Sequence, residues 1–73
     1  MIKNSIQKQL GKKVRDLRTA KGYSQESFAH DCDLHRTYIG CIERGEKNVT
    51  INNITKIAKV LKINLSSLFE GIK

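Results

Sequence analysis

Residues 24–45, SQESFAHDCDLHRTYIGCIERG, contain two short helical patterns separated by a tight turn. Ser24 is a good N-cap residue, and it predicts a first helix over residues 25–32. A second helix is expected over residues 35–44, and it should end before Gly45 because glycine is a common residue just after a helix C-terminus. The segments on either side of this pair of helices complete the predicted fold.

The segments on either side also carry helical patterns. Apolar residues recur at spacings of three and four up to Gly22, and Thr50 and Asn64 are good N-caps for later helices. No segment alternates like a strand, so the sequence predicts an all-α fold of five helices in a single domain, residues 1–73. The three further helices are expected over residues 5–21, 51–61 and 65–70. The buried side of the fourth helix is expected to carry Ile51, Ile54, Ala58 and Leu61.

The charge of the chain points to a polyanionic partner. Its 73 residues include 14 Lys and Arg against 7 Asp and Glu, for a formal net charge of +7 and a pI near 9.7. Such an excess favours nucleic acid first and an acidic membrane surface second. No apolar run approaches the roughly 18 residues of a membrane-spanning helix, and the first residues lack the apolar core of a signal peptide. The sequence therefore predicts a cytoplasmic protein with no membrane partner.

The cysteines and histidines predict neither a metal site nor an enzyme. Cys32 and Cys41 are expected to be free thiols, because the cytoplasm is reducing and there is no C-x-x-C pair. With His30 and His35 they have no metal-ligand spacing, so no metal or other cofactor is predicted. Neither histidine stands in a recognisable catalytic arrangement, so no catalytic residue is predicted.

Two short helices joined by a tight turn, in a small basic all-α domain, are typical of a helix-turn-helix reader of double-stranded DNA. In the helix over residues 35–44, Ile39 and Ile42 share one side and should face the core. The opposite side is short-chained or basic, as a helix needs to be to enter a major groove about 12 Å wide. The candidates for base contact are Arg36, Thr37, Tyr38 and Cys41.

Each candidate has a plainer alternative. Arg36 stands at the helix tip, where base contact competes with a phosphate clamp or a solvated charge. For Thr37 the alternative is support of the helix start. Tyr38 lies at the flank of the outward side, where packing is the alternative. Cys41 is otherwise a small outward residue without a redox role.

Two long segments resemble the Cro and lambda-repressor-like helix-turn-helix family, also called XRE. They are LGKKVRDLRTAKGYSQESFA, residues 10–29, and IERGEKNVTINNITKIAKVLKINLSSLF, residues 42–69. Asp33 departs from the family pattern, in which glycine is common at this turn, but aspartate tolerates a positive φ better than most residues. The resemblance implies the five-helix fold and DNA binding.

Within that family, RTYIGCIERGEKNVT, residues 36–50, is similar to the controller proteins of bacterial restriction-modification systems. This resemblance implies a homodimer that binds an operator in double-stranded DNA and regulates transcription of its own gene and of the endonuclease gene. RNA polymerase is a further candidate partner. An antitoxin-type protein-interaction module and a phage-type repressor stay open as alternatives.

Residues at the helix ends and in the following loop are expected to contact the DNA backbone. Gln25 begins the first helix of the pair, where backbone N–H groups and the side-chain amide can both meet a phosphate. His35 is expected chiefly as the N-cap of the second helix. The resemblance to controller proteins adds Asn48 and Thr50. The full set is Gln25, His35, Arg44, Lys47, Asn48 and Thr50.

Two further sets of residues have expected structural roles. The resemblance implies a partly buried ion pair between Arg18 and Glu43, which ties the first helix to the recognition helix and takes no part in DNA contact. The last helix is more apolar than a short terminal helix in a small core needs, which predicts a dimer interface. The residues expected there are Leu65, Leu68 and Phe69.

Overall fold

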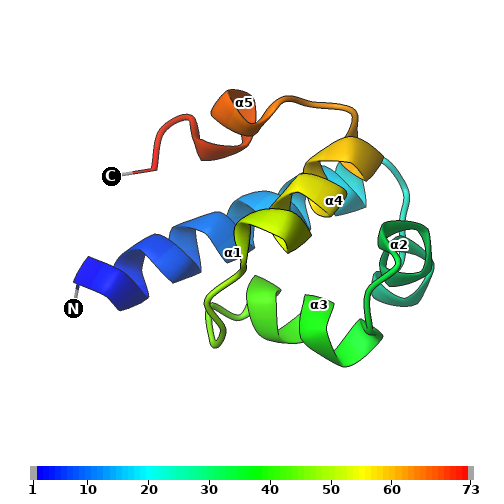
Figure 1. Cartoon of the computed structure of the whole chain (residues 1–73), viewed down its shortest axis with the longest axis horizontal. Coiled ribbons are helices and arrows are strands. Elements are labelled where there is room, and N and C mark those ends of the chain that lie inside the picture. The colour runs from blue at the N-terminus through cyan, green and yellow to red at the C-terminus, as the bar shows by residue number, and fades with distance from the viewer. Residues whose placement is uncertain (1, 73) are drawn as a thin grey trace.

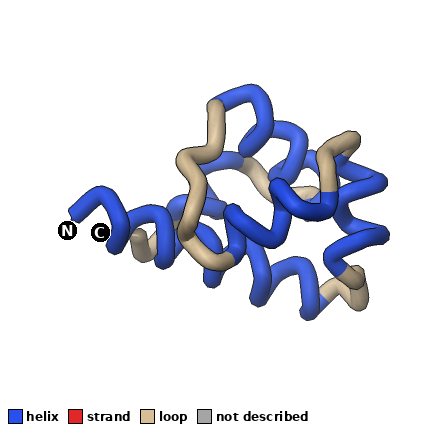
Figure 2. Tube along the Cα trace, turned by 90° about the horizontal axis from the view of Figure 1, so that it is seen from below, coloured by secondary structure: helices blue, strands red, loops and turns tan. Residues whose placement is uncertain are grey.

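The computed structural model describes residues 2–72. Five helices follow one another: α1 (Ile2–Ala20), α2 (Gln25–Cys32), α3 (Arg36–Glu43), α4 (Ile51–Leu61) and α5 (Leu65–Phe69). Figure 2 shows helices and loops and no strand within this range. The predicted all-α class with five helices is therefore confirmed.

α2 and α4 have the predicted bounds, and the ends of α1, α3 and α5 differ from the predicted ones by up to three residues. α1 begins at Ile2 rather than Ser5, because serine disfavours a helix interior only weakly and no proline precedes it. α3 is one residue shorter at each end, with His35 and Arg44 in the two cap positions. α5 ends at Phe69, one residue early. Helix termini depend on local hydrogen bonds that residue spacing does not reveal.

The helices are arranged so that one side of α3 faces outward. α1 packs against α3 and α5, and α2 packs against both α3 and α4. Figure 1 shows α1 running along the length of the molecule, with α5 above it and α3 along the lower edge. The rest of the chain therefore leaves the outer side of α3 uncovered.

All five helices contribute to one hydrophobic core. Phe28 of α2 and Ile39 of α3 are fully buried, and Ile42 is almost so. On α4, Ile54, Ala58 and Leu61 are buried as predicted, but Ile51 is 67 % exposed and Ile57 takes its place in the core. The placement of Ile51 in the core was wrong. It is the first residue of α4, and Ile57 satisfies the same helical spacing from a central position.

The structure also corrects one residue of the predicted dimer interface. Leu68 has no exposed surface and belongs to the core of its own chain. Leu65 is half-buried, and Phe69 is 39 % exposed. Part of the apolar excess of α5 is thus used within the monomer, because α5 packs against both α1 and α4.

Local hydrogen bonds begin three helices and set the turn between α2 and α3. Ser24, Thr50 and Asn64 each accept a hydrogen bond from the backbone N–H three residues later, at 3.0, 3.2 and 2.8 Å. These are the predicted N-caps, and a cap of this kind contributes about 1 kcal/mol. Asp33 adopts the left-handed conformation expected of it, with φ 57°. The turn therefore forms although the family's usual glycine is absent.

Gly11 brings α1 against the end of α3. A Cβ at this position would lie 2.2 Å from the carbonyl oxygen of Ile42 and 2.8 Å from that of Glu43. These are backbone atoms, which cannot move aside as a side chain can. Only glycine therefore allows α1 to support α3 at this distance.

Candidate nucleic-acid interface

A buried ion pair holds α3 in place. Arg18 Nε donates to Glu43 Oε2 at 2.6 Å and Arg18 Nη2 donates to Oε1 at 3.1 Å, with the two side chains 9 % and 3 % exposed. Arg18 Nη1 also donates to the carbonyl oxygen of Tyr23 at 2.8 Å. The expected pair is therefore present. It connects α1, the loop after it and α3.

Gln25 joins the same network. Its Nε2 donates to Glu43 Oε1 at 3.0 Å, so the first residue of α2 is tied to the last residue of α3. Its other amide atom, Oε1, would lie 3.7 Å from a Cβ on Gly40. The sequence expectation had the amide meeting a phosphate as a donor. In the structure the Gln25 Nε2 group donates to Glu43 instead, and the amide oxygen is the atom of this side chain on the side of Gly40.

The outer side of α3 surrounds a shallow hollow. Arg36 and Thr37 are exposed, while Gly40 lies in the following turn and adds no side chain. With Gln25 and Arg44 these residues line a space of about 260 Å³. The structure thus brings together two predicted base contacts and two predicted backbone contacts. Gly40 is buried, with Arg44 Nη1 3.2 Å and Gln25 Oε1 3.7 Å from the position that its Cβ would take.

Tyr38 lies apart from this hollow. Its ring packs against the core, and its hydroxyl accepts a hydrogen bond from Asn53 Nδ2 of α4 at 3.1 Å. Cys41 is half-buried and lies next to Gly40 in α3, where its Sγ accepts a hydrogen bond from Arg44 Nη2 at 3.5 Å. Cys41 is thus hydrogen-bonded to a residue that lines the hollow, whereas the Tyr38 hydroxyl is bonded to α4.

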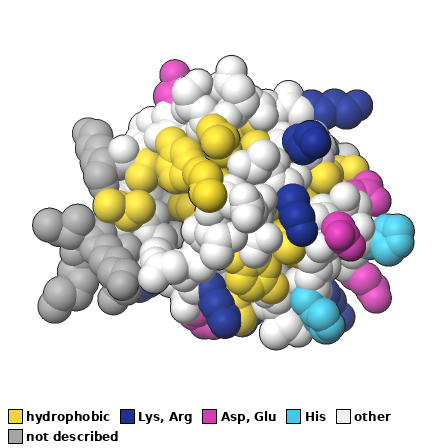
Figure 3. All heavy atoms as spheres, in the orientation of Figure 1, with side chains coloured by type: hydrophobic (Ala, Val, Ile, Leu, Met, Phe, Trp, Pro, Cys, Tyr) yellow, Lys and Arg dark blue, Asp and Glu magenta, His cyan; other side chains and the backbone are white. Residues whose placement is uncertain are grey.

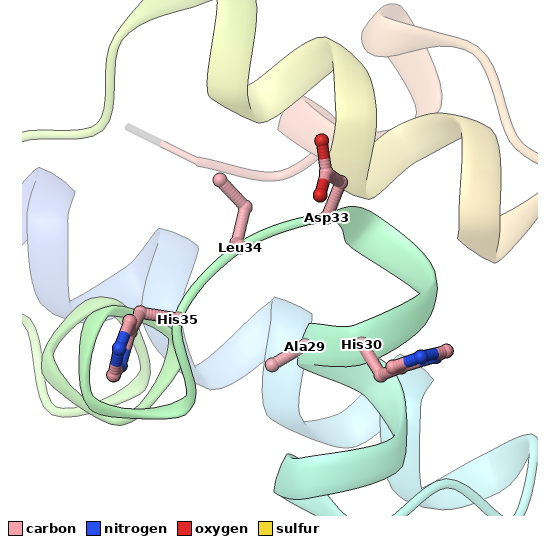
Figure 4. Close-up of a pocket in the computed structure, with 5 residues that line it drawn as sticks. All are labelled: Ala29, His30, Asp33, Leu34 and His35. Carbon is pink, nitrogen blue, oxygen red and sulfur yellow. The ribbon is translucent and has the colours of Figure 1, made fainter.

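His35 occupies the N-cap position of α3 but makes no side-chain capping hydrogen bond. A second hollow, of about 340 Å³, lies between the end of α2 and this position. Figure 4 shows the imidazoles of His30 and His35 on opposite sides of it, pointing away from each other. The described residues contain no group of three or more His, Cys, Asp or Glu side chains that could hold a metal ion. The two histidines therefore form no common site.

The loop after α3 carries the remaining predicted backbone contacts. Lys47 is exposed, and the Oδ1 atom of Asn48 accepts a hydrogen bond from Gln7 Nε2 of α1. Thr50 is exposed, although its hydroxyl also caps α4. The loop is thus attached to α1 at one point and to α4 at its end.

Arg44 is held by an exposed ion pair. Its Nε donates to Glu46 Oε2 at 3.0 Å. This hydrogen bond raises the pKa of Arg44 and lowers the pKa of Glu46, so both groups stay charged over a wide pH range. Burial raises the pKa of Cys32 to about 11, which makes it the less reactive of the two free thiols.

Three residues that support this site were not predicted from the sequence, namely Gly11, Gln7 and Asn53. Gly11 could have been suspected, because a glycine inside a helical pattern is costly without a packing reason. The Gln7–Asn48 and Asn53–Tyr38 hydrogen bonds join residues 41 and 15 positions apart and left no local signal.

Within the described range, no helix is both long enough and apolar enough to cross a bilayer. Figure 3 shows hydrophobic side chains gathered on one face, from α5 toward the start of α4. Among the side chains that the structure describes, the exposed large apolar residues are Ile6, Ile51 and Phe69.

Known proteins resemble this chain in sequence and in fold. Residues 14–68 match the family described as helix-turn-helix. The chain is 48 % identical over 68 residues to the control protein C.BamHI of Bacillus amyloliquefaciens, covering 92 % of this chain and 84 % of that protein.

Solved structures of controller proteins superpose closely. The restriction-modification controller protein C.AhdI from Aeromonas hydrophila gives a TM-score of 0.84 at 46 % identity, over 86 % of this chain and 96 % of that chain. The structure of C.Esp1396I bound to a 25 base pair operator site gives a TM-score of 0.80 at 33 % identity, over 92 % of this chain and 88 % of that chain. The chain therefore belongs to the helix-turn-helix family of XRE-type DNA-binding transcription regulators, among the relatives of the restriction-modification control proteins.

Proposed function

We propose that the chain binds an operator in double-stranded DNA by placing the outer side of α3 in the major groove. The observation that carries this proposal is the hollow lined by Gln25, Arg36, Thr37, Gly40 and Arg44 on an uncovered helix face. The buried Arg18–Glu43 pair fixes that face relative to α1 and α2. A rigid, basic helix face that carries no side chain of its own at position 40 suits a groove about 12 Å wide.

The base contacts are assigned to the N-terminal half of this face. Arg36 and Thr37 are exposed in the first turn of α3, from which long donors reach base edges. Arginine pairs with O6 and N7 of guanine, and threonine suits a base edge or a thymine methyl group. Cys41 is one turn further along α3, and its short side chain can contact a base only where the helix lies close to the base edges. Tyr38 would serve at the groove edge, because its hydroxyl bonds to Asn53.

The backbone contacts are assigned to the flanks. Lys47, Asn48 and Thr50 follow α3 in the loop, His35 precedes it, and the N-terminus of α2 at Gln25 offers backbone N–H groups to a phosphate. The net charge of +7 adds long-range attraction to DNA.

The proposed assembly is a homodimer formed through α5. Phe69 is 39 % exposed and Leu65 is half-buried, and Figure 3 shows hydrophobic side chains gathered around α5. A two-fold dimer would present two copies of α3 to two half-sites. Phe69→Glu should shift sedimentation toward monomer and weaken binding to a two-half-site operator, with circular dichroism as the folding control. A wild-type monomer at tens of micromolar, roughly the range for a modest interface, would contradict this assembly.

Regulation of a restriction-modification system is the proposed biological role. It is supported by the similarity to control proteins over 92 % of this chain. The proposed targets are the chain's own promoter and that of an endonuclease gene, with RNA polymerase as the partner at the promoter. Transcription in vitro from both promoters should respond to the protein. A neighbouring toxin gene would instead favour the antitoxin alternative.

The DNA-reading assignment is tested with Arg36→Ala. Binding to a pool of duplexes with randomised half-sites should show lost preference at one position per half-site, at a cost of roughly 1 to 3 kcal/mol. Lys47→Ala is the matched control, and it should weaken all sequences evenly. If Arg36→Ala kept the preferred sequence and only lowered affinity, Arg36 would be a phosphate clamp.

A further inference from the structure

The guanidinium of Arg44 is folded back along the outer side of α3. Its Nη2 donates to Cys41 Sγ at 3.5 Å, and its Nη1 lies 3.2 Å from the position of a Cβ on Gly40. Residues 40 and 41 belong to the preceding turn of the helix. The charged group therefore lies over the middle of α3, although Arg44 itself stands at the C-terminal cap.

This position places the guanidinium at the hollow that Arg36 and Thr37 also line. Gly40 makes the position available, because any side chain there would crowd Nη1. Since the guanidinium lies beside residues 40 and 41, it is about 6–7 Å along the helix axis from Arg36. The two side chains would therefore reach different positions of one half-site in a groove that holds α3.

Glu46 orients the group. Its carboxylate accepts from Nε at 3.0 Å, and its own backbone N–H donates to the carbonyl oxygen of Cys41 at 2.9 Å, which anchors it beside α3. The Nη1 and Nη2 edge of the guanidinium is the edge that Glu46 does not use. Two parallel N–H donors on that edge match O6 and N7 of guanine.

The same carboxylate argues against a phosphate contact. A phosphate approaching Arg44 would meet the negative charge of Glu46 beside it, and like charges repel. A guanine edge carries only partial negative charge, and an arginine already held in place loses little side-chain freedom on binding.

We propose that Arg44 is a second base-reading residue, which selects a guanine at a different position of the half-site from the base contacted by Arg36, with Glu46 as its positioning residue. The inference rests on the proposed placement of α3 in the major groove. It replaces the sequence expectation that Arg44 contacts the DNA backbone.

The test compares Arg44→Lys and Glu46→Ala on duplexes with randomised half-sites. Arg44→Lys keeps the charge but loses the planar fork, so it should lose about 5- to 150-fold of discrimination at one position, distinct from that of Arg36. Glu46→Ala should relax the same position and weaken binding to the preferred operator. Asp16→Ala is the matched control, because it also removes a carboxylate and an exposed ion pair, with Lys12 at 2.9 Å.

Three results would overturn the inference. Arg44→Lys with unchanged base preference and evenly lower affinity would make Arg44 a phosphate clamp. Glu46→Ala with higher affinity for every sequence, beyond the effect of Asp16→Ala, would make Glu46 a brake on phosphate binding. If the wild-type protein had no base preference, the proposed function would be wrong as well. If Arg36→Ala alone changed the base preference, the inference on Arg44 would be wrong and the proposed function would stand.

Discussion

Two glycines inside helices, Gly11 and Gly40, provide a matched pair of substitutions with opposite expected effects on stability. An alanine Cβ at Gly11 would lie 2.2 Å from the backbone oxygen of Ile42. At Gly40 the nearest atom is Nη1 of Arg44, at 3.2 Å, the far end of a flexible side chain. Both substitutions add one methyl group, but only Gly11→Ala requires a helix to move.

The expected magnitudes follow from these contacts. Alanine gains up to about 1 kcal/mol over glycine in a helix interior, and this gain applies at both positions. At Gly11 the carbon–oxygen contact requires α1 and the end of α3 to separate by about 1 Å, and overpacking of this kind costs roughly 1–3 kcal/mol. Because the obstacle is backbone, we expect the upper end of that range. Gly11→Ala should then be less stable than wild type by about 2 kcal/mol, or roughly 8–16 °C in Tm.

The assay is thermal unfolding followed by circular dichroism, at one fixed protein concentration because dimer formation makes Tm concentration-dependent. Gly40→Ala should melt at the wild-type temperature or a few degrees above it. If Gly11→Ala melted as high as Gly40→Ala, the close approach of α1 to Ile42 would not constrain the fold, and the argument for Gly11 would be refuted.

Three further predictions concern charge. Glu43→Gln should destabilise the protein by about 3 kcal/mol in urea unfolding, because Arg18 would stay buried without its carboxylate; a loss below about 1 kcal/mol would contradict this. The logarithm of the operator affinity should fall linearly with the logarithm of salt concentration, with a slope of about −0.9 per phosphate contact, and a flat dependence would rule out phosphate binding as the main attraction. The hydroxyl of Tyr23 donates to Asp31 at 2.7 Å and lowers the pKa of that carboxyl. The stability from this hydrogen bond is present above the pKa of Asp31 in the unfolded chain, and it is lost as pH falls through the lowered pKa of the folded chain. The Tm difference between wild type and Tyr23→Phe should therefore shrink from pH 7 toward pH 3, about one unit below the unfolded pKa. A constant Tm difference would show that the hydrogen bond does not stabilise the fold.

Features that depend on neighbouring residues were predictable from the sequence. The five helices follow from apolar spacing, and the caps at Ser24, Thr50 and Asn64 require only a polar side chain before a helical pattern. The positive φ of Asp33 follows from the tight turn between two helices. The Arg18–Glu43 pair was expected only through the family resemblance, because the two residues are 25 positions apart.

Features that depend on how helices meet were not predictable from spacing. Ile51 and Ile57 have the same chemistry and both fit a helical stripe, and only the packing of α4 decides which one is buried. The burial of Leu68 depends on where α5 lies against α1 and α4. The direction of Arg44 likewise depends on Glu46 and on the missing side chain at position 40.

The central claim is that the outer side of α3 lies against DNA, and the natural cysteines test it without any mutation. Cys41 is half-buried on α3 close to the hollow, whereas Cys32 is buried in the core with a pKa of about 11 and serves as the internal control. Alkylation by iodoacetamide at pH 8 should modify Cys41 first. Saturating amounts of the preferred duplex, selected from a randomised pool, should slow that modification, since the groove would enclose the thiol. An unchanged rate at Cys41 with the duplex fully bound would show that another surface of the protein contacts the DNA.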